Sequence, residues 1–169
     1  MKIEEAIQKA IEYETRILEM YTQAALEITD ARGQKVFGML ADEERGHVAY
    51  LKGKLQQWHE QGTVHFDSLS SHLPDLDSIQ AEVHKVSDRF SSKPLNRERQ
   101  ILEQALQAEM ETSEFYENLV STLTGDGCKM FARFLEIENG HLQLVQAELD
   151  FITHSGFWFD FPEFDMEAI

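Results

Sequence analysis

The sequence predicts an all-α protein, an antiparallel four-helix bundle with one long connection between its second and third helices. Four long stretches place apolar residues at alternating steps of three and four, the spacing of a helix that packs one face into a bundle. Only a few residues join the first stretch to the second and the third to the fourth, so each pair should form antiparallel neighbours. The second half of the chain also repeats the pattern of the first. With 169 residues, the chain (1–169) has the length of one domain.

The first helix is predicted over about residues 3–29. Its core-facing residues are Ile3, Ile7, Ala10, Glu14, Ile17, Tyr21, Ala24 and Ile28. Only Glu14 among them is charged, and a carboxylate on such a face is costly unless it is paired or binds a metal. After a short turn capped by Asp30, the second helix is predicted over about 34–61. Its core-facing residues are Phe37, Leu40, Glu44, His47, Leu51, Leu55 and Trp58.

Residues 62–93 break this pattern with glycine, serine and proline, and they contain one short helical candidate at about 75–90. A connection of this length is uncommon in a compact domain unless it has a task, and crossing the bundle from one end to the other is such a task. Four histidines lie in or beside it at no metal-ligand spacing. We expect them to be surface or packing residues: His59, His65, His72 and His84.

The third helix is predicted over about 94–123, with Pro94 in its first turn, and the fourth over about 127–153. Their core-facing residues are Leu102, Ala105, Glu109, Thr112, Tyr116, Leu119 and Leu123, then Phe131, Phe134, Glu138, His141, Val145, Leu149 and Ile152. The tail at 154–169 alternates aromatic and acidic residues. It is interpreted either as a strap over the bundle surface or as a contact between subunits, since aromatic residues are enriched in interface cores.

Two Glu-x-x-His sequences lie within these helices: Glu44-Arg45-Gly46-His47 and Glu138-Asn139-Gly140-His141. On a helix, residues three apart share one face, so each pair can direct a carboxylate oxygen and an imidazole nitrogen at the same ion. One such pair alone would be interpreted as a chance surface pair. Glycine inside a helix costs about 1 kcal/mol relative to alanine. We expect Gly46 and Gly140 to allow a close approach of neighbouring helices.

The internal repeat adds partners to these two pairs. At an offset of 94 or 95 residues, the following residues align: Glu44 with Glu138, His47 with His141, Glu14 with Glu109, and Tyr21 with Tyr116. A duplicated helical hairpin has pseudo-twofold symmetry, so four carboxylates and two imidazoles should meet in the core. This is the donor set of dinuclear sites in helical bundles, with one glutamate from each of two helices and Glu-x-x-His from each of the other two.

Charge and donor chemistry are consistent with a metal pair. Two divalent cations and four ionised glutamates would form a buried cluster of almost no net charge. Mixed oxygen and imidazole donors suit iron or manganese better than zinc. The alternative is a structural polar core in which some of the glutamates are protonated.

Composition excludes several partners and locations. A net charge of −16 would be repelled by nucleic acid and by anionic membranes, and no apolar run approaches the roughly 20 residues needed to cross a membrane. The single cysteine, Cys128, excludes an internal disulfide and a Cys-x-x-Cys metal site. No secretory signal is recognisable at the N-terminus, so we expect a cytoplasmic protein.

At these glutamates and histidines the chain resembles the ferritin-like superfamily, in particular rubrerythrin-like proteins, and its ligand pattern is similar to that of bacterioferritins. The resemblance covers residues 3–61 and 95–153. It implies a centre of two Fe ions, for which Mn or Zn could substitute. It also implies these roles: Glu14 and Glu109 as terminal ligands, Glu44 and Glu138 as bridging ligands, and His47 and His141 as one cap for each iron.

The same resemblance implies that Tyr21 and Tyr116 orient the terminal glutamates, the alternative being ordinary core aromatics. Typical rubrerythrins also carry a cysteine-ligated rubredoxin domain, whereas these 169 residues contain a single cysteine, so we expect any electron donor to be another protein. Many have a further glutamate three residues after the ligand of the third helix, where this chain has Thr112. The long crossover and the aromatic tail are unlike a cage-forming bacterioferritin.

The function implied is that of a non-haem di-iron oxidoreductase whose iron gives electrons to H₂O₂ or O₂. One alternative is a ferroxidase that serves iron storage or transfer. Another, in a different class, is a metal-stabilised structural or partner-binding bundle. A homodimer is the expectation at the level of the family.

Overall fold

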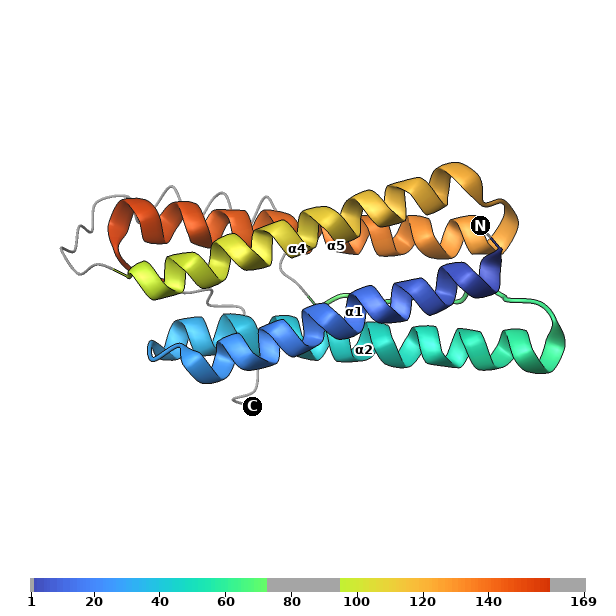
Figure 1. Ribbon diagram of the computed structural model, residues 1–169, viewed down its shortest axis with the longest axis horizontal. Helices are drawn as coiled ribbons and strands as arrows, with labels where there is room; N and C mark the ends of the chain where they lie inside the picture. Colours follow the sequence, from blue (N-terminus) through green and yellow to red (C-terminus); the bar gives the residue numbers. More distant parts are fainter. Residues whose placement is uncertain (1, 73–94, 159–169) are drawn as a thin grey trace.

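The computed structural model describes residues 2–72 and 95–158, and within these two ranges all regular secondary structure is α-helical. Four helices form two antiparallel hairpins (Figure 1). α1 (Ile3–Glu27) packs along α2 (Ala31–Gln61), and α4 (Asn96–Thr122) packs along α5 (Gly125–Ser155). The most extensive contact between the hairpins joins α1 to α4. The predicted all-α, four-helix architecture is therefore confirmed. None of the described helices is long and apolar enough to cross a membrane.

The helix ends differ from the predicted ones by a few residues. α2 begins at Ala31, earlier than predicted, because the Asp30 side chain accepts a hydrogen bond from the backbone N–H of Arg32 at 2.9 Å and so caps the helix there. α2 ends at Gln61 and is followed by Gly62, whose φ of 69° lies in the left-handed region that glycine adopts without steric cost. α4 begins at Asn96 rather than at residue 94, and Pro94 itself lies outside the described residues.

The end of α2 and the start of α4 lie at opposite ends of the bundle, the arrangement that a lengthwise connection requires (Figure 1). The first part of that connection, residues 63–72, runs back along α2. Lys54 donates to the backbone carbonyl of His65 at 2.6 Å, and Tyr50 donates to that of Asp67 at 3.1 Å. The helical candidate at 75–90 and His84 lie outside the described residues.

The core consists of two apolar clusters, and every helix contributes to both. One contains Ile17, Tyr21, Ala24, Phe37, Leu40, Leu102, Ala105, Leu144, Val145 and Ile152, among others. The second contains Ala6, Ile7, Ala10, Leu51, Tyr116, Leu119, Met130, Phe131 and Phe134. Each helix supplies residues to one cluster near one end and to the other cluster near its other end. The predicted core-facing glutamates and histidines lie between these two sets of residues. The apolar faces thus hold these polar side chains at mid-height in the bundle.

The start of the aromatic tail packs against the first hairpin. Trp158 is 1% exposed, and its ring meets that of Phe37 edge-on, with 5.8 Å between ring centroids. It lies over Gly33, where a Cβ would come within 2.5 Å of the indole, so only glycine fits. This packing agrees with the strap interpretation for Trp158. Residues 159–169 lie outside the described part of the chain.

Candidate metal centre

A layer of buried acidic and imidazole side chains separates the two apolar clusters. All six donors predicted from the sequence lie in it, and none is more than 2% exposed: Glu14 from α1, Glu44 and His47 from α2, Glu109 from α4, and Glu138 and His141 from α5. They are buried because each occupies a position on the apolar face of its helix. The structure therefore brings together the whole predicted set, while metal ligation by it stays a prediction.

The Nδ1 atom of His47 faces carboxylates from three helices. It lies 3.1 Å from Oε2 of Glu14, 3.2 Å from Oε2 of Glu44 and 3.3 Å from Oε1 of Glu138. A ring nitrogen carries at most one proton and cannot make good hydrogen bonds to three acceptors. Three oxygens around one nitrogen are instead what the donors of a shared cation would show.

His141 has the same surroundings in the second half of the layer. Its Nδ1 atom lies 2.7 Å from Oε1 of Glu44, 3.5 Å from Oε2 of Glu138 and 3.7 Å from Oε1 of Glu109. Glu44 and Glu138 thus face both histidines, each through its two different oxygens.

The donors form two overlapping groups of four, and in each group the ligand atoms lie within 4.8 Å of one another. The two groups are Glu14, Glu44, His47 and Glu138, and Glu44, Glu109, Glu138 and His141. Two carboxylates are common to both groups, and one glutamate and one histidine belong to each alone. This sharing is the arrangement of two adjacent metal positions.

Each tyrosine predicted near the site reaches the glutamate of the opposite hairpin. The Tyr21 hydroxyl donates to Oε1 of Glu109, and the Tyr116 hydroxyl donates to Oε1 of Glu14. α1 and α4 run antiparallel (Figure 1), so a residue seven positions beyond the glutamate of one helix lies level with the glutamate of the other. Both rings are fully buried, one in each apolar cluster.

The pKa values of the four carboxyls separate into two pairs. Burial, and then repulsion from Glu138 and Glu44, raises the pKa of Glu14 well above its usual range, and burial with repulsion from Glu138 does the same for Glu109. Burial also disfavours ionisation of Glu44 and Glu138. The nearby imidazoles outweigh that burial, and the pKa of both carboxyls is lowered.

Both imidazoles have a raised pKa. Burial works against the charged ring, but the carboxylates around His47 and His141 outweigh it and raise the pKa well above the usual value. Without metal, these shifts favour ionised Glu44 and Glu138 facing charged imidazole rings, and they favour the protonated form of Glu14 and Glu109. The layer is then close to electrically neutral, which explains how a buried cluster of this size is tolerated.

Buried polar atoms without hydrogen bonds test whether a metal would fit. Among the described residues these include Oε1 of Glu44, Oε2 of Glu109, both oxygens of Glu138, both ring nitrogens of His141 and Nε2 of His47. Oε1 of Glu44 is close to Nδ1 of His141, but the pair lacks hydrogen-bond geometry. Such atoms are rare in folded proteins. Carboxylate oxygens and imidazole nitrogens that converge in this way fit divalent cations, so the cluster could hold metal.

The sequence pattern missed two buried acidic residues, Glu148 and, next to the histidines, Glu43. It is 8% exposed, and one of its atoms lies within 4.8 Å of ring nitrogens of His47 and His141. It is one step off the core-facing spacing of α2 and has no acidic counterpart in the repeat. The only signal was the acidic run Asp42-Glu43-Glu44.

Of two residues singled out beside the site, one differs from what the sequence suggested and the other agrees with it. A Cβ on Gly46 would meet nothing within 4 Å, so the expectation that this glycine permits a close helix approach is wrong. Thr112 is buried, as its core-facing position predicts, but its hydroxyl donates to the carbonyl of Ala108 at 3.0 Å, within its own helix.

Comparison with protein-family models, with curated proteins and with solved structures finds no match to this chain. The fold and the site define it as an all-α four-helix bundle with a buried Glu/His cluster that could hold metal.

Proposed function

We propose that this chain is a ferritin-like, non-haem di-iron oxidoreductase of the rubrerythrin type, which reduces H₂O₂ or O₂. The observation that carries the proposal is the sharing of Glu44 and Glu138 between two four-residue donor groups. A single metal site would need only one such group. Two groups with two carboxylates in common provide for a carboxylate-bridged pair.

In this proposal the six donors hold the ions in two equivalent sets. Glu14 and His47 belong to one position, Glu109 and His141 to the other, and Glu44 and Glu138 serve both. When bound, two ferrous ions supply the two electrons that reduce H₂O₂ to water. The oxygen and nitrogen donors suit iron or manganese, and zinc could substitute as a redox-inactive ion.

The chain's other residues would orient the donors and keep water out. The Tyr21 and Tyr116 hydroxyls hold one oxygen of Glu109 and of Glu14, which leaves the second oxygen of each to face its ion. The two apolar clusters cover the layer on both sides along the bundle. Exclusion of water strengthens the electrostatic interactions inside the site.

The test is an anaerobic titration of the metal-free chain with Fe²⁺, followed by rapid mixing with H₂O₂ or O₂. We expect saturation at two ions per chain and an oxidation-linked rise in near-ultraviolet absorbance. Glu138→Ala should abolish the two-ion stoichiometry. The matched control is Glu136→Ala on the same helix, because this side chain is 71% exposed and pairs only with Arg133 among the described residues. Binding of fewer than two ions, or oxidation no faster than that of free Fe²⁺, would refute the proposal.

The same experiment separates two other functions. A ferroxidase would react faster with O₂ than with H₂O₂ and would release Fe³⁺ to an added acceptor. A structural metal site is favoured by the near-complete burial of all six donors, since structural sites are closed. It predicts two bound ions and a higher free energy of unfolding, with no reaction with either oxidant.

A further inference from the structure

The outward-facing ring nitrogens of the two histidines have no partner in the site as described so far. Each ring directs Nδ1 toward the carboxylates, while the Nε2 atoms of His47 and His141 are buried and make no hydrogen bond among the described residues. A histidine that binds metal through one nitrogen donates the N–H of its other nitrogen to a carboxylate, a carbonyl or a water in most metal sites. The centre therefore requires an acceptor on the outer side of the rings.

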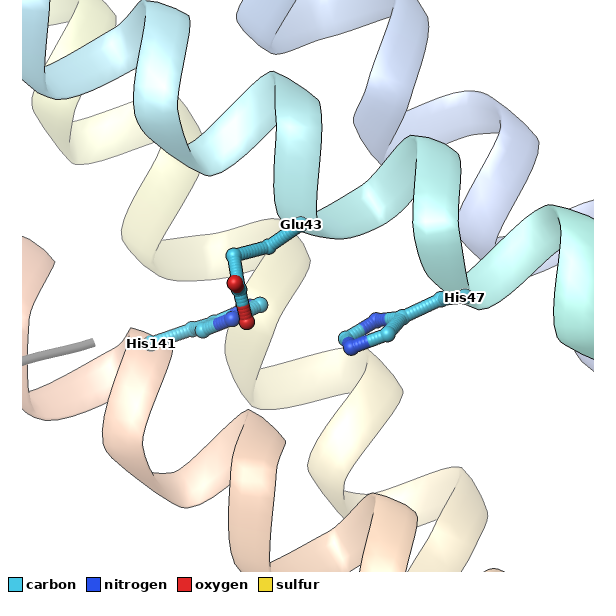
Figure 2. Close-up of side chains that lie close together, drawn as sticks. All are labelled: Glu43, His47 and His141. Carbon is cyan, nitrogen blue, oxygen red and sulfur yellow. The ribbon is translucent and has the colours of Figure 1, made fainter. Parts of the chain in front are cut away.

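Glu43 is the only further acidic side chain grouped with these two rings in the described part of the chain. Its carboxylate extends from α2 toward both imidazoles (Figure 2), and one atom of each of the three residues lies within 4.8 Å of the other two. The Glu43 side chain is 6% exposed, and its Oε2 atom has no hydrogen-bond partner among the described residues. A buried carboxylate with a free oxygen is costly, so its presence asks for a donor.

The other oxygen of Glu43 is fixed from outside. Oε1 accepts from the backbone N–H of His72 at 2.9 Å and lies 3.0 Å from Nδ1 of the same residue. His72 belongs to the segment that runs back along α2, and its side chain is 83% exposed. Two contacts from one residue hold the carboxylate in place and leave Oε2 available to the rings.

The internal repeat shows that Glu43 is not required by the fold. At the offset that aligns Glu44 with Glu138, Glu43 aligns with Ile137, which is 4% exposed. The equivalent position in the other half is thus filled by an apolar residue at no electrostatic cost. One carboxylate, on one side of a pseudo-symmetric layer, lies near both rings.

The chemistry of the two rings favours a hydrogen-bond acceptor over a third cation at this place. The rings of His47 and His141 are stacked, with centroids 5.5 Å apart and planes 12° from parallel. A neutral imidazole that binds metal through Nδ1 carries its proton on Nε2, so Nε2 has no lone pair for a further ion. A carboxylate oxygen has two lone pairs and can accept from both N–H groups, directly or through one water.

We propose that Glu43 is a positioning residue of the metal centre: it accepts hydrogen bonds from the Nε2–H groups of His47 and His141 and so presents both Nδ1 atoms to the ions, while His72 holds it there. This inference rests on the proposed function, because it requires that the histidines bind metal. It assigns a task to the segment after α2, which connects to the centre through His72.

The experiment uses the full chain loaded with Zn²⁺, which is diamagnetic, with the histidine rings observed by long-range ¹H–¹⁵N NMR and the Zn²⁺ affinity measured by competition with a chelator. In the wild type, we expect His47 and His141 to show metal-bound Nδ1 and a protonated, hydrogen-bonded Nε2. Glu43→Ala should lower the affinity about 10- to 100-fold and make the Nε2 protons exchange faster with water. Glu43→Gln keeps an acceptor oxygen and should restore most of the affinity.

Two controls separate positioning from general stability. Asp42→Ala removes the neighbouring carboxylate, which is 75% exposed, and should leave affinity and ring signals unchanged. Metal-free Glu43→Ala should unfold at the same or a higher urea concentration than the wild type, because it loses a buried oxygen without a partner. A merely structural role predicts that the metal-free variant is less stable while the ring signals stay as they were.

The outcomes for the two proposals are distinct. Two bound Zn²⁺ ions with Nε2 signals and affinity unaffected by Glu43→Ala would overturn this inference and leave the proposed function in place. Failure of the wild type to bind two ions would overturn both. If Glu43→Ala does not fold, Glu43→Gln gives the decision, because an amide oxygen is a weaker acceptor than a carboxylate. The Nε2 protons must then exchange faster with water than in the wild type, and unchanged exchange would overturn the inference.

Discussion

Loading the metal-free chain with two divalent ions at about pH 6 should release protons from both kinds of donor. The pKa of Glu14 and of Glu109 is raised well above its usual range by burial and by the neighbouring carboxylates, which favours the protonated form of both without metal. The pKa of His47 and of His141 is raised by the carboxylates around each ring, so both are imidazolium. Metal binding needs these donors deprotonated.

The magnitude follows from counting these groups. Two carboxyls and two imidazolium rings give up one proton each, so about four protons leave when two ions enter. Two doubly charged ions then replace four single charges, and the net charge of the layer does not change. With two protons per ion, the affinity should rise about 100-fold per ion for each pH unit, equivalent to ~2.7 kcal/mol, while all four groups remain protonated in the metal-free state.

Isothermal titration calorimetry with Zn²⁺ measures this release. Titrations in buffers of different ionisation enthalpy give the number of protons from the dependence of the observed heat on the buffer. Glu14→Gln combined with Glu109→Gln removes the two carboxyl protons and should reduce the release to about two. Release of fewer than two protons by the wild type at pH 6 would refute the assignment of protons to the layer.

Three further predictions concern stability. Tyr21→Phe and Tyr116→Phe should each lower the free energy of unfolding by about 1–3 kcal/mol, since each leaves a buried carboxyl oxygen without its donor. Urea denaturation measures the change. A loss of stability no larger than that of Tyr13→Phe would contradict the prediction. Gly33→Ala should lower the free energy of unfolding by about 1–3 kcal/mol, because its Cβ would meet Trp158 at 2.5 Å. Gly38→Ala, whose Cβ would meet nothing within 4 Å, should raise the free energy of unfolding by up to about 1 kcal/mol. Equal losses of stability in the two variants would exclude the close contact at Gly33. In the presence of a chelator, the free energy of unfolding should fall as the pH rises above about 6.5. The two imidazoles have raised pKa values in the folded chain, and their contribution to stability is lost as the pH passes through those values. A free energy of unfolding that rises over this range, measured by urea denaturation, would contradict the assignment of charge to the two rings.

The sequence was sufficient to predict the layer because periodicity determines which face of a helix is buried. Glu14 and Glu109 each occupy a core-facing position among apolar residues, and both are 0% exposed. The repeat then related the two hairpins without any knowledge of their packing. The same reasoning predicted four helices with the correct faces, and the helix ends differed where local capping, as at Asp30, decided them.

What the sequence did not predict depends on how the hairpins lie relative to one another. The spacing of Tyr21 from Glu14 does not say which glutamate its hydroxyl reaches, because that depends on the level of α4 beside α1. Glu43 is held by His72, in a segment without periodicity, so no pattern marked it. The packing of Trp158 on Phe37 likewise joins an isolated aromatic residue to a distant helix, and periodicity does not report such a contact.

Because neither hairpin contains a complete donor group, the site exists only when both are present. The first group takes Glu138 from the second hairpin, the second takes Glu44 from the first, and each tyrosine crosses between them. Ion binding at the proposed centre would therefore link the two halves of the molecule. Two copies of a single hairpin, placed about a twofold axis, would present the same six donors. The present chain corresponds to such a pair made continuous, and Glu43 opposite Ile137 marks a place where its halves have become different.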